Sequence, residues 1–425
     1  MSLLIFHPSV AVFVQQAARS LHEARQLDRF ITTVRDDPTS LRQRGFCTLG
    51  RIVGRDLGSQ FRRRAVTEIP LEKVECHPWG ELLRLATGAV DRDGRLTDFV
   101  WERTETGFDR LVARRLHAGL TGVYGFEYSS LATFRRARAL GLRVIYDVPA
   151  PEPRFVQTLL DAEIEKFPEL RTPYHRYTAR REEARIARRH AEWDAADLVV
   201  AASTFTRDSF ARAGIDIAKV RIVPYGAPPA VDESAAASGG SSTGPVQLLW
   251  AGTFSVRKGA HYLLDAWRRH NLGQIARLRV FGAVMLPDEL LHPLPKGIEL
   301  GGSIPRSELM AHYQSSDALV FPTLCDGFGM VVTEAWSRGL PVLTTPDAGA
   351  SDFLRDRENG MLFPPRDPDA LASMVSWCSE HRPELRAMRP GARTTAAAWQ
   401  WSDYRAALRA ALGPLLEGTR SYSVP

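Results

Sequence analysis

The chain has 425 residues, of which 44% are hydrophobic and 24% are charged, and it carries a formal net charge of +6 with a pI near 9.3. This length suffices for two or three domains, and the composition is that of an ordinary globular protein. No apolar run approaches the roughly 18 residues that cross a bilayer. No zinc-finger, RNP-type or helix-turn-helix pattern accompanies the arginines, so we expect no nucleic-acid partner.

The N-terminal segment and the cysteines indicate a cytoplasmic protein. The opening residues, MSLLIFHPS, have too short an apolar part for a signal peptide and are typical of a first strand. The four cysteines are widely scattered and form no CxxC pair, so we expect reduced thiols at Cys47, Cys76, Cys325 and Cys378.

Short apolar runs alternate with helical patterns through the first half of the chain. The predicted strands are residues 3–7, 29–34, 122–127, 143–148, 197–203 and 221–226. The intervening helices include residues 13–24 and 180–193. This alternation favours a parallel sheet of the α/β class.

The same alternation returns after a segment of different composition. Residues 227–245 are rich in Ala, Ser, Gly and Pro, which is typical of a solvated linker. The predicted strands beyond it are residues 246–252, 277–283, 298–303, 318–322, 341–345 and 360–364. We therefore predict an α/β fold with two Rossmann-like doubly wound domains facing a cleft, an N-terminal domain at 1–226 and a C-terminal domain at 246–399.

A basic element follows the first strand of the second half. The strand leads to Gly252, a short loop carries Arg257 and Lys258, and an amphipathic helix follows Gly259. Two cations at the carboxyl end of a strand suit a pyrophosphate, because ligands of such sheets bind at that edge.

An acidic element lies in LVFPTLCDGFGMVVTEAWSRGLPVLTT. A buried strand at 318–321 leads to Asp326 and the Gly-Phe-Gly turn at 327–329, and a helix begins near Met330 and carries Glu334. The bare helix start favours a phosphate, and the two carboxylates suit sugar hydroxyl groups. Phosphate and sugar hydroxyls together describe a nucleotide sugar.

These two elements resemble the signature of retaining glycosyltransferases of family 4, which have the two-Rossmann GT-B-type fold. Asp326 stands where the family usually has Glu. Thr253 follows Gly252 where a basic residue is common, so either Arg257 supplies that charge or the charge is absent. The resemblance implies a catalytic set of Arg257, Lys258, Asp326 and Glu334. It also implies donor contacts from Gly252, Gly282, Ile304, Gly327, Phe328, Gly329 and Met330.

The resemblance is weaker in the first 140 residues, where the acceptor would bind. Three acceptor-side candidates lie at the carboxyl ends of predicted strands: His7, Glu127 and Asp147. His7 has a capping or packing role as an equal alternative, and Glu127 could instead stabilise the start of the next helix. In the family the last helix crosses back onto the first domain, so we expect residues 400–425 there, and their pattern predicts an amphipathic helix pair.

The resemblance implies transfer of a hexose from a nucleoside-diphosphate sugar to a saccharide or lipid-linked acceptor, with retention, in surface polysaccharide or glycoconjugate synthesis. A nucleotide-sugar epimerase of the same fold and a non-catalytic binding subunit remain alternatives. We expect neither a cofactor nor a metal, since Asp91 and Asp93 precede a glycine and are typical of a turn.

Arginine clusters at 62–64, 135–136, 180–181 and 188–189 give the first half its positive charge. One interpretation is peripheral contact with an anionic membrane at its inner face, and the other is a set of solvated helix faces.

Overall fold

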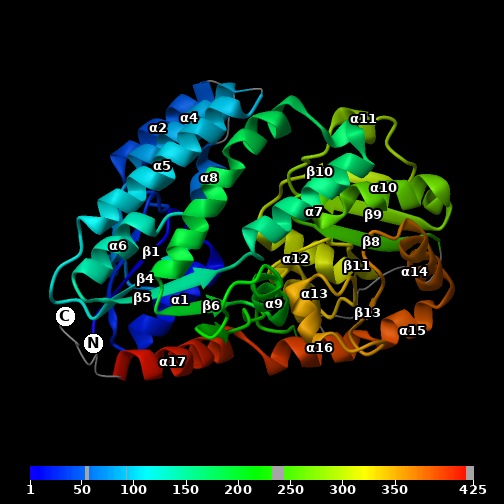
Figure 1. Cartoon of the computed structure of the whole chain (residues 1–425). Helices are drawn as coiled ribbons and strands as arrows, with labels where there is room; N and C mark the ends of the chain where they lie inside the picture. Colours follow the sequence, from blue (N-terminus) through cyan, green and yellow to red (C-terminus); the bar gives the residue numbers. More distant parts are fainter. Residues whose placement is uncertain (53–56, 92, 232–243, 418–425) are drawn as a thin grey trace.

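The computed structural model describes residues 1–52, 57–91, 93–231 and 244–417, and it contains two β-sheets with helices on both faces (Figure 1). All strand pairs in both sheets are parallel. The predicted α/β class with two Rossmann-like units is confirmed.

The first sheet has, within the described residues, seven strands in the spatial order β3-β2-β1-β4-β5-β6-β7. They are β1 (Leu3–Phe6), β2 (Leu27–Thr32), β3 (Val74–Cys76), β4 (Gly122–Phe126), β5 (Arg143–Val148), β6 (Leu198–Ala201) and β7 (Val220–Ile222). The central strands are buried along their whole length because helices cover both faces.

The second sheet has six strands over the same described ranges, in the order β10-β9-β8-β11-β12-β13. They are β8 (Val246–Ala251), β9 (Ala276–Phe281), β10 (Ile298–Gly302), β11 (Ala318–Phe321), β12 (Val342–Thr344) and β13 (Gly360–Leu362). The strand order reverses between β1 and β4 in one sheet and between β8 and β11 in the other. Ligands of doubly wound sheets bind at the carboxyl ends of such strands.

Helices of the first half are α1 (Val12–Glu23), α2 (Leu41–Ile52), α3 (Leu57–Arg62), α4 (Trp79–Val90), α5 (Arg95–Ala113), α6 (Leu131–Ala139), α7 (Pro153–Lys166), α8 (Pro173–Ala195) and α9 (Thr204–Arg212). Those of the second half are α10 (Ala260–Arg269), α11 (Asp288–Leu291), α12 (Arg306–Ser315), α13 (Met330–Ser337), α14 (Pro368–Glu380), α15 (Arg382–Ala387), α16 (Arg389–Ala398) and α17 (Trp401–Glu417). The short 3-10 helices are η1 (Leu71–Lys73), η2 (Pro168–Leu170), η4 (Val256–Lys258), η5 (Leu272–Gln274) and η6 (Gly349–Phe353).

The long helices α7 and α8 begin where local sequence dictates. Each has proline at its first position, where the missing N–H costs no hydrogen bond. The side chain of Glu152 accepts from the N–H of Phe155, and that of Thr172 accepts from the N–H of His175. These caps satisfy N–H groups that the helix itself leaves unpaired.

Helix α7 belongs by its place in the chain to the first half, but it packs against the second sheet's helices (Figure 1). The buried carboxylate of Glu163 lies 3.1 Å from Nε2 of His261 and 2.8 Å from Nε of Arg366. Lys166 donates to the hydroxyl of Tyr262 at 3.0 Å. The two halves are therefore held together by the packing of α7 on the second half as well as by the linker.

Helix α17 packs along α1, at the outer side of the first sheet (Figure 1). Ser20 donates to the carbonyl of Arg405 at 2.9 Å, and the Arg405 guanidinium reaches Gln16 and Glu23. The predicted helix pair is wrong, since one helix runs through Pro414. Leu412 and Leu416 are both buried on one face of it, and this packing offsets the hydrogen bond that proline removes.

One apolar cluster runs continuously between the two sheets. Tyr225 of the first half packs edge-on against Phe328 at a ring distance of 5.4 Å, and it also contacts Trp401 and Tyr404. The start of the predicted linker belongs to this junction, because the N–H groups of Ala227 and Val231 donate to carbonyls of the second half. Residues 232–243 of that linker lie outside the described residues. Among the described helices, none is long and apolar enough to cross a membrane.

Candidate active site

The basic and acidic elements meet at the carboxyl ends of the adjacent strands β8 and β11. The N–H of Leu324 donates to the carbonyl of Arg257 at 2.9 Å, and Nη1 of Arg257 donates to the carbonyl of Cys325 at 2.8 Å. Gly259 has φ 76°, and a Cβ there would lie 1.9 Å from the Pro322 carbonyl oxygen. Only glycine lets the two loops approach this closely.

Asp326 lies beside both predicted cations. Its Oδ2 is 3.6 Å from Nζ of Lys258 and 3.8 Å from Nη1 of Arg257. Burial favours a raised pKa for Asp326, but the positive charges of Lys258 and Arg257 and the N–H of Phe328 hold the pKa below its ordinary value. The site therefore keeps an ionised carboxylate under two cations.

Lys258 is itself mostly shielded, with a side chain that is 14% exposed. Its Nζ lies 5.1 Å from the centre of the Phe321 ring, and a Cβ at Gly252 would come within 3.2 Å of it. Gly252 and Gly282 also pack backbone to backbone, since a Cβ at Gly282 would lie 2.1 Å from the Gly252 carbonyl oxygen. The absence of side chains at Gly252 and Gly282 therefore leaves room for the side chain of Lys258 at the end of β8.

Helix α13 begins directly after this loop. Gly329 is left-handed with φ 83°, and no side chain among the described residues caps the helix. The first N–H groups of α13 are therefore available for an anion, and the helix dipole favours one. Met330, the first helical residue, is partly buried.

Glu334 lies within α13 and belongs to a second polar group. It accepts from Arg306 at 2.8 Å and from the Tyr313 hydroxyl at 3.2 Å. Burial raises the pKa of Glu334, while Arg306 opposes that rise. Tyr313 is fully buried, and its bond to Glu334 was not predicted from the sequence. Nearby Ile304 is partly buried against the main core.

Two predicted donor residues also hold the halves together. The Gly327 carbonyl accepts from Ser203 at 2.6 Å and from Thr206 at 3.0 Å. A Cβ at Gly327 would lie 2.0 Å from the Pro149 carbonyl oxygen, and Phe328 is 2% exposed. In the sequence, the only feature that points to this contact is the presence of two hydroxyl side chains, Ser203 and Thr206, shortly after β6.

The acceptor-side candidates lie at the carboxyl ends of β1, β4 and β5. Nδ1 of His7 is 2.9 Å from the N–H of Ser9, and the ring packs edge-on against Phe126 at 5.0 Å. Burial lowers the pKa of His7 to about 4, so the ring is neutral at pH 7. These contacts fit the alternative prediction, in which His7 has a packing or capping role. His7 also lines a cavity.

Asp147 does not reach an open surface. Its side chain is buried, and it accepts from the hydroxyls of Tyr124 at 2.6 Å and Tyr225 at 3.4 Å. Burial raises the pKa of Asp147 to about 7. Asp147 was predicted to face the acceptor because it lies at the carboxyl end of a strand. The ring of Tyr225 packs over that end and covers the carboxylate.

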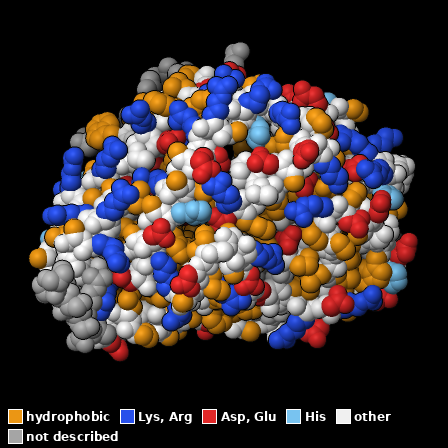
Figure 2. Space-filling view, viewed as in Figure 1, with side chains coloured by type: hydrophobic (Ala, Val, Ile, Leu, Met, Phe, Trp, Pro, Cys, Tyr) orange, Lys and Arg blue, Asp and Glu red, His pale blue; other side chains and the backbone are white. Residues whose placement is uncertain are grey.

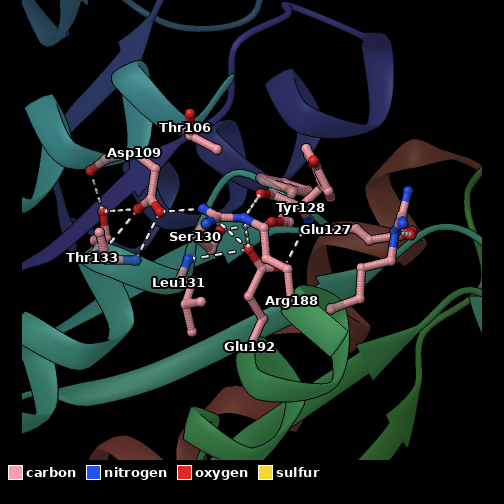
Figure 3. Close-up of polar contacts among 12 residues, drawn as sticks. Thr106, Asp109, Glu127, Tyr128, Ser130, Leu131, Thr133, Arg188 and Glu192 are labelled. Atoms are coloured by element: carbon pink, nitrogen blue, oxygen red, sulfur yellow. Dashed lines mark hydrogen bonds and ion pairs between the residues drawn. The ribbon is translucent and has the colours of Figure 1, made fainter. Parts of the chain in front are cut away.

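Glu127 is open to two cavities and pairs with Arg189. The alternative role at the start of α6 belongs to other carboxylates, as Figure 3 shows. Glu192 accepts from the N–H groups of Ser130 and Leu131 at 2.9 and 3.1 Å. Asp109 accepts from those of Ala132 and Thr133 at 2.7 and 2.8 Å.

Arg188 ties this network to the turn that carries Glu127 (Figure 3). It lies between Asp109 and Glu192, and its Nε donates to the Tyr128 carbonyl at 2.6 Å. Tyr128 has φ 76°, a strained conformation for a residue with a side chain, and its N–H donates to Glu192 at 2.7 Å. The partly buried arginine therefore fixes a strained turn at the edge of a cavity that Tyr128 lines.

No cluster of three or more His, Cys, Asp or Glu side chains with the geometry of a metal site occurs in the described part of the chain. The expectation that transfer needs no metal stays a prediction.

Comparison with known proteins agrees with this geometry. Residues 245–381 match the family model of glycosyl transferases group 1. The second half of the chain resembles the group 1 glycosyltransferases. Glycogen synthase of Mycobacterium tuberculosis is 30% identical to this chain over 141 residues, which cover 31% of this chain and 34% of that protein. The chain thus spans, by sequence, about a third of the length of that relative.

Solved structures match the whole chain. Sucrose-phosphate synthase from Thermosynechococcus elongatus has a TM-score of 0.66 at 16% identity, covering 99% of this chain and 100% of that one. HepE of Anabaena, in complex with UDP-glucose, has a TM-score of 0.57 at 15% identity, covering 97% and 99%. These likenesses show that the group 1-like segment is one half of a two-domain GT-B-type fold.

Proposed function

We propose that the chain is a retaining glycosyltransferase that moves a hexose from a nucleoside-diphosphate sugar to a saccharide or lipid-linked acceptor. The observation that carries this proposal is the convergence of Arg257, Lys258 and the uncapped start of α13 beside Asp326. The match of residues 245–381 to glycosyl transferases group 1 supports it.

The chemistry follows from charge. The bond between the sugar's anomeric carbon and the diphosphate oxygen breaks, and a bond from that carbon to the acceptor oxygen forms. Arg257, Lys258 and the α13 N–H groups stabilise the negative charge on the departing diphosphate. The leaving phosphate oxygen takes the acceptor's proton on the same face, which retains the configuration. Asp326 and Glu334 bind donor hydroxyl groups.

A UDP-hexose is the donor that the comparisons favour, because HepE was solved with UDP-glucose and shares this fold. The two cations and the helix start supply the positive potential that a metal ion supplies elsewhere, so we propose metal-independent transfer. Assays with and without EDTA test this, and loss of activity with EDTA would contradict it.

Two alternatives make different products. A nucleotide-sugar epimerase of the same fold would invert one carbon of the donor's sugar without glycosylating an acceptor, and a binding subunit would leave the donor unchanged. Measuring UDP release from UDP-glucose with and without an acceptor mixture, together with the epimers present in the remaining nucleotide sugar, separates the three. Acceptor-dependent release of the nucleoside diphosphate is the result expected here, and its absence across UDP-, GDP-, ADP- and TDP-sugars would overturn the proposal.

We propose a cytoplasmic location with peripheral contact to the inner face of an anionic membrane, in surface polysaccharide or glycoconjugate synthesis. Exposed arginines such as Arg62 and Arg63 support this contact, and basic side chains are spread over this face of the first half (Figure 2). Arg188 and Arg189 do not contribute, because both lie in internal ion pairs. Sedimentation with anionic vesicles at low salt, abolished by high salt, tests this contact.

A further inference from the structure

A cavity of about 420 Å³ lies at the carboxyl ends of β2 and β3, inside a small apolar cluster that is separate from the cores of the two sheets. The cluster consists of the buried side chains of Val34, Phe61 and Leu82 with Phe46 packed against them, and all four line the cavity. Protein interiors normally leave few voids larger than a water molecule, and sites for small ligands are cavities of this size with mainly apolar walls. The cluster therefore leaves room for an apolar ligand.

The wall of this cavity also holds an incompletely paired arginine. Nη2 of Arg35 lies 3.5 Å from Oδ2 of Asp37, while Nη1 is buried and has no hydrogen-bond partner among the described residues. Arg35 and Asp37 are the charged residues that line the cavity, so their charges offset one another. A buried donor without an acceptor is unfavourable, and an oxygen atom of a bound ligand would supply that acceptor. The site thus suits a molecule with an apolar part and an oxygen-bearing head.

Trp79 connects the cavity to the surface of the protein. It lines the cavity and is 67% exposed, and Leu83 and Val90, on the same face of α4, are 53% and 75% exposed. This stripe lies at the outer side of the first half (Figure 1). Arg62 and Arg63 are exposed and directly follow Phe61 of the cavity wall. Exposed apolar side chains beside basic ones are typical of contact with anionic lipid.

The cavity lies on the same side of the first sheet as the candidate active site. A second cavity, at β1 and β4, is lined by Glu127, which also lines a third that reaches Arg257. Strands β2 and β5 are three positions apart in the sheet, which corresponds to roughly 15 Å at the usual strand spacing. A ligand whose chain fills the first cavity would therefore have its head on the side of the sheet where Arg257 lies.

We propose that this cavity holds the hydrocarbon chain of a lipid-linked acceptor, and that Arg35 donates a hydrogen bond to an oxygen at the start of its head group. The inference rests on the proposed glycosyl transfer and selects the lipid-linked acceptor over the free saccharide. Burial of the chain removes apolar surface from water, which is the main source of its affinity.

Direct binding to the full chain, measured by calorimetry without donor, tests the cavity. The probes are decyl glucoside, below the concentration at which it forms micelles, and methyl glucoside. The decyl probe is expected to bind at least about 100-fold more tightly, because each buried methylene group raises affinity about fourfold. Arg35→Met should weaken decyl glucoside about tenfold through loss of a charged donor, and an unchanged affinity would overturn the role of Arg35.

Two neighbouring leucines of α4 provide a matched pair of variants. Leu82 is buried and lines the cavity, whereas Leu83 is exposed. Leu82→Trp adds an indole ring to the cavity and should abolish the preference for the decyl probe, while Leu83→Trp should retain it. Circular dichroism checks the folding of both variants.

A measurement on the unmodified protein keeps the test independent of how Leu82→Trp folds. Cys76 is a free, partly exposed cysteine that lines the cavity. Decyl glucoside should slow the alkylation of Cys76 by iodoacetamide, and methyl glucoside should not. Mass spectrometry of the peptide that contains Cys76 measures the reaction at this thiol alone. Equal affinity for the two probes, full decyl binding by folded Leu82→Trp, or an unprotected Cys76 overturns the cavity assignment.

UDP release from UDP-glucose is scored separately, with the decyl and methyl glycosides of glucose, galactose, mannose and N-acetylglucosamine as acceptors. At low acceptor concentration, at least one decyl glycoside should give at least about tenfold faster release than its methyl counterpart, because tighter binding lowers KM. Equal release with both would overturn the proposal, since the chain would then belong to a bound lipid that is not the acceptor. Chain binding without release by any acceptor would remove the proposed function and leave the cavity, and acceptor-dependent release without chain binding would do the reverse.

Discussion

Nζ of Lys258 lies 3.6 Å from the carboxylate of Asp326, across the carboxyl ends of two adjacent parallel strands. The pair connects the basic and acidic elements that the sequence presents separately. Its geometry leaves the lysine at the edge of the space where a diphosphate would sit.

Replacing Lys258 with alanine removes one of the charges proposed to stabilise the departing diphosphate. We expect kcat to fall by at least about 100-fold, the scale for losing one such group, with the fold intact. Steady-state UDP release by the purified variant measures this, and circular dichroism checks folding. Lys296→Ala, an exposed lysine of the same half, should transfer at the wild-type rate. Near-normal turnover in Lys258→Ala would remove the lysine from the site.

Glu334→Ala should also lower turnover by at least about 100-fold, because a charged group proposed to hold the donor is lost. The variant also frees Arg306 and Tyr313 from their shared partner. Tyr313→Phe keeps the carboxylate and its bond to Arg306, so it should lose far less activity. Equal loss in both variants would indicate that Glu334 acts only through the packing of α12.

Arg188→Ala should destabilise the protein strongly. It leaves the buried carboxylates of Asp109 and Glu192 without their cation, and breaking such a buried pair costs about 3 to 5 kcal/mol. Thermal unfolding measures the loss. Arg154→Ala, which removes an exposed ion pair with Glu183, is the control and should leave the Tm unchanged. Similar Tm values for both variants would show that the network of Figure 3 adds no stability.

Asp147 should make stability depend on pH. Its pKa is about 7 in the folded protein and near 4 when unfolded, so the folded state binds more protons between these values. The free energy of unfolding should therefore decline from pH 4 to pH 7, relative to Asp147→Asn, which stays neutral. Urea titrations across this range measure the difference. A constant difference would mean that the carboxyl group keeps an ordinary pKa.

The second half was predicted almost completely, since all six strands expected there form the sheet. Strands β8, β11, β12 and β13 are short, mostly apolar runs beside a glycine or proline, and such runs are typical of buried parallel strands. The first half was predicted less fully. Strand β3 is three residues long and only partly buried, so it carries no apolar pattern. Helices α2 to α5 were not predicted.

The candidate site was likewise predicted only in part. The convergence of Lys258 and Asp326 follows from two motifs at strand ends, and strand order brings them together. The Arg188 network was not predicted, because it depends on how α5, α6 and α8 pack against one another. Contacts between residues far apart in the chain leave no local spacing in a single sequence.

The hydroxyls of Ser203 and Thr206 donate hydrogen bonds to the carbonyl of Gly327, the residue directly after Asp326. Any swing of one half of the molecule away from the other must stretch or break these bonds. A change in the relative position of the halves would therefore move the loop that carries Asp326, the proposed donor-binding residue. A ligand that favours one arrangement of the halves would then change the affinity of that loop for the donor.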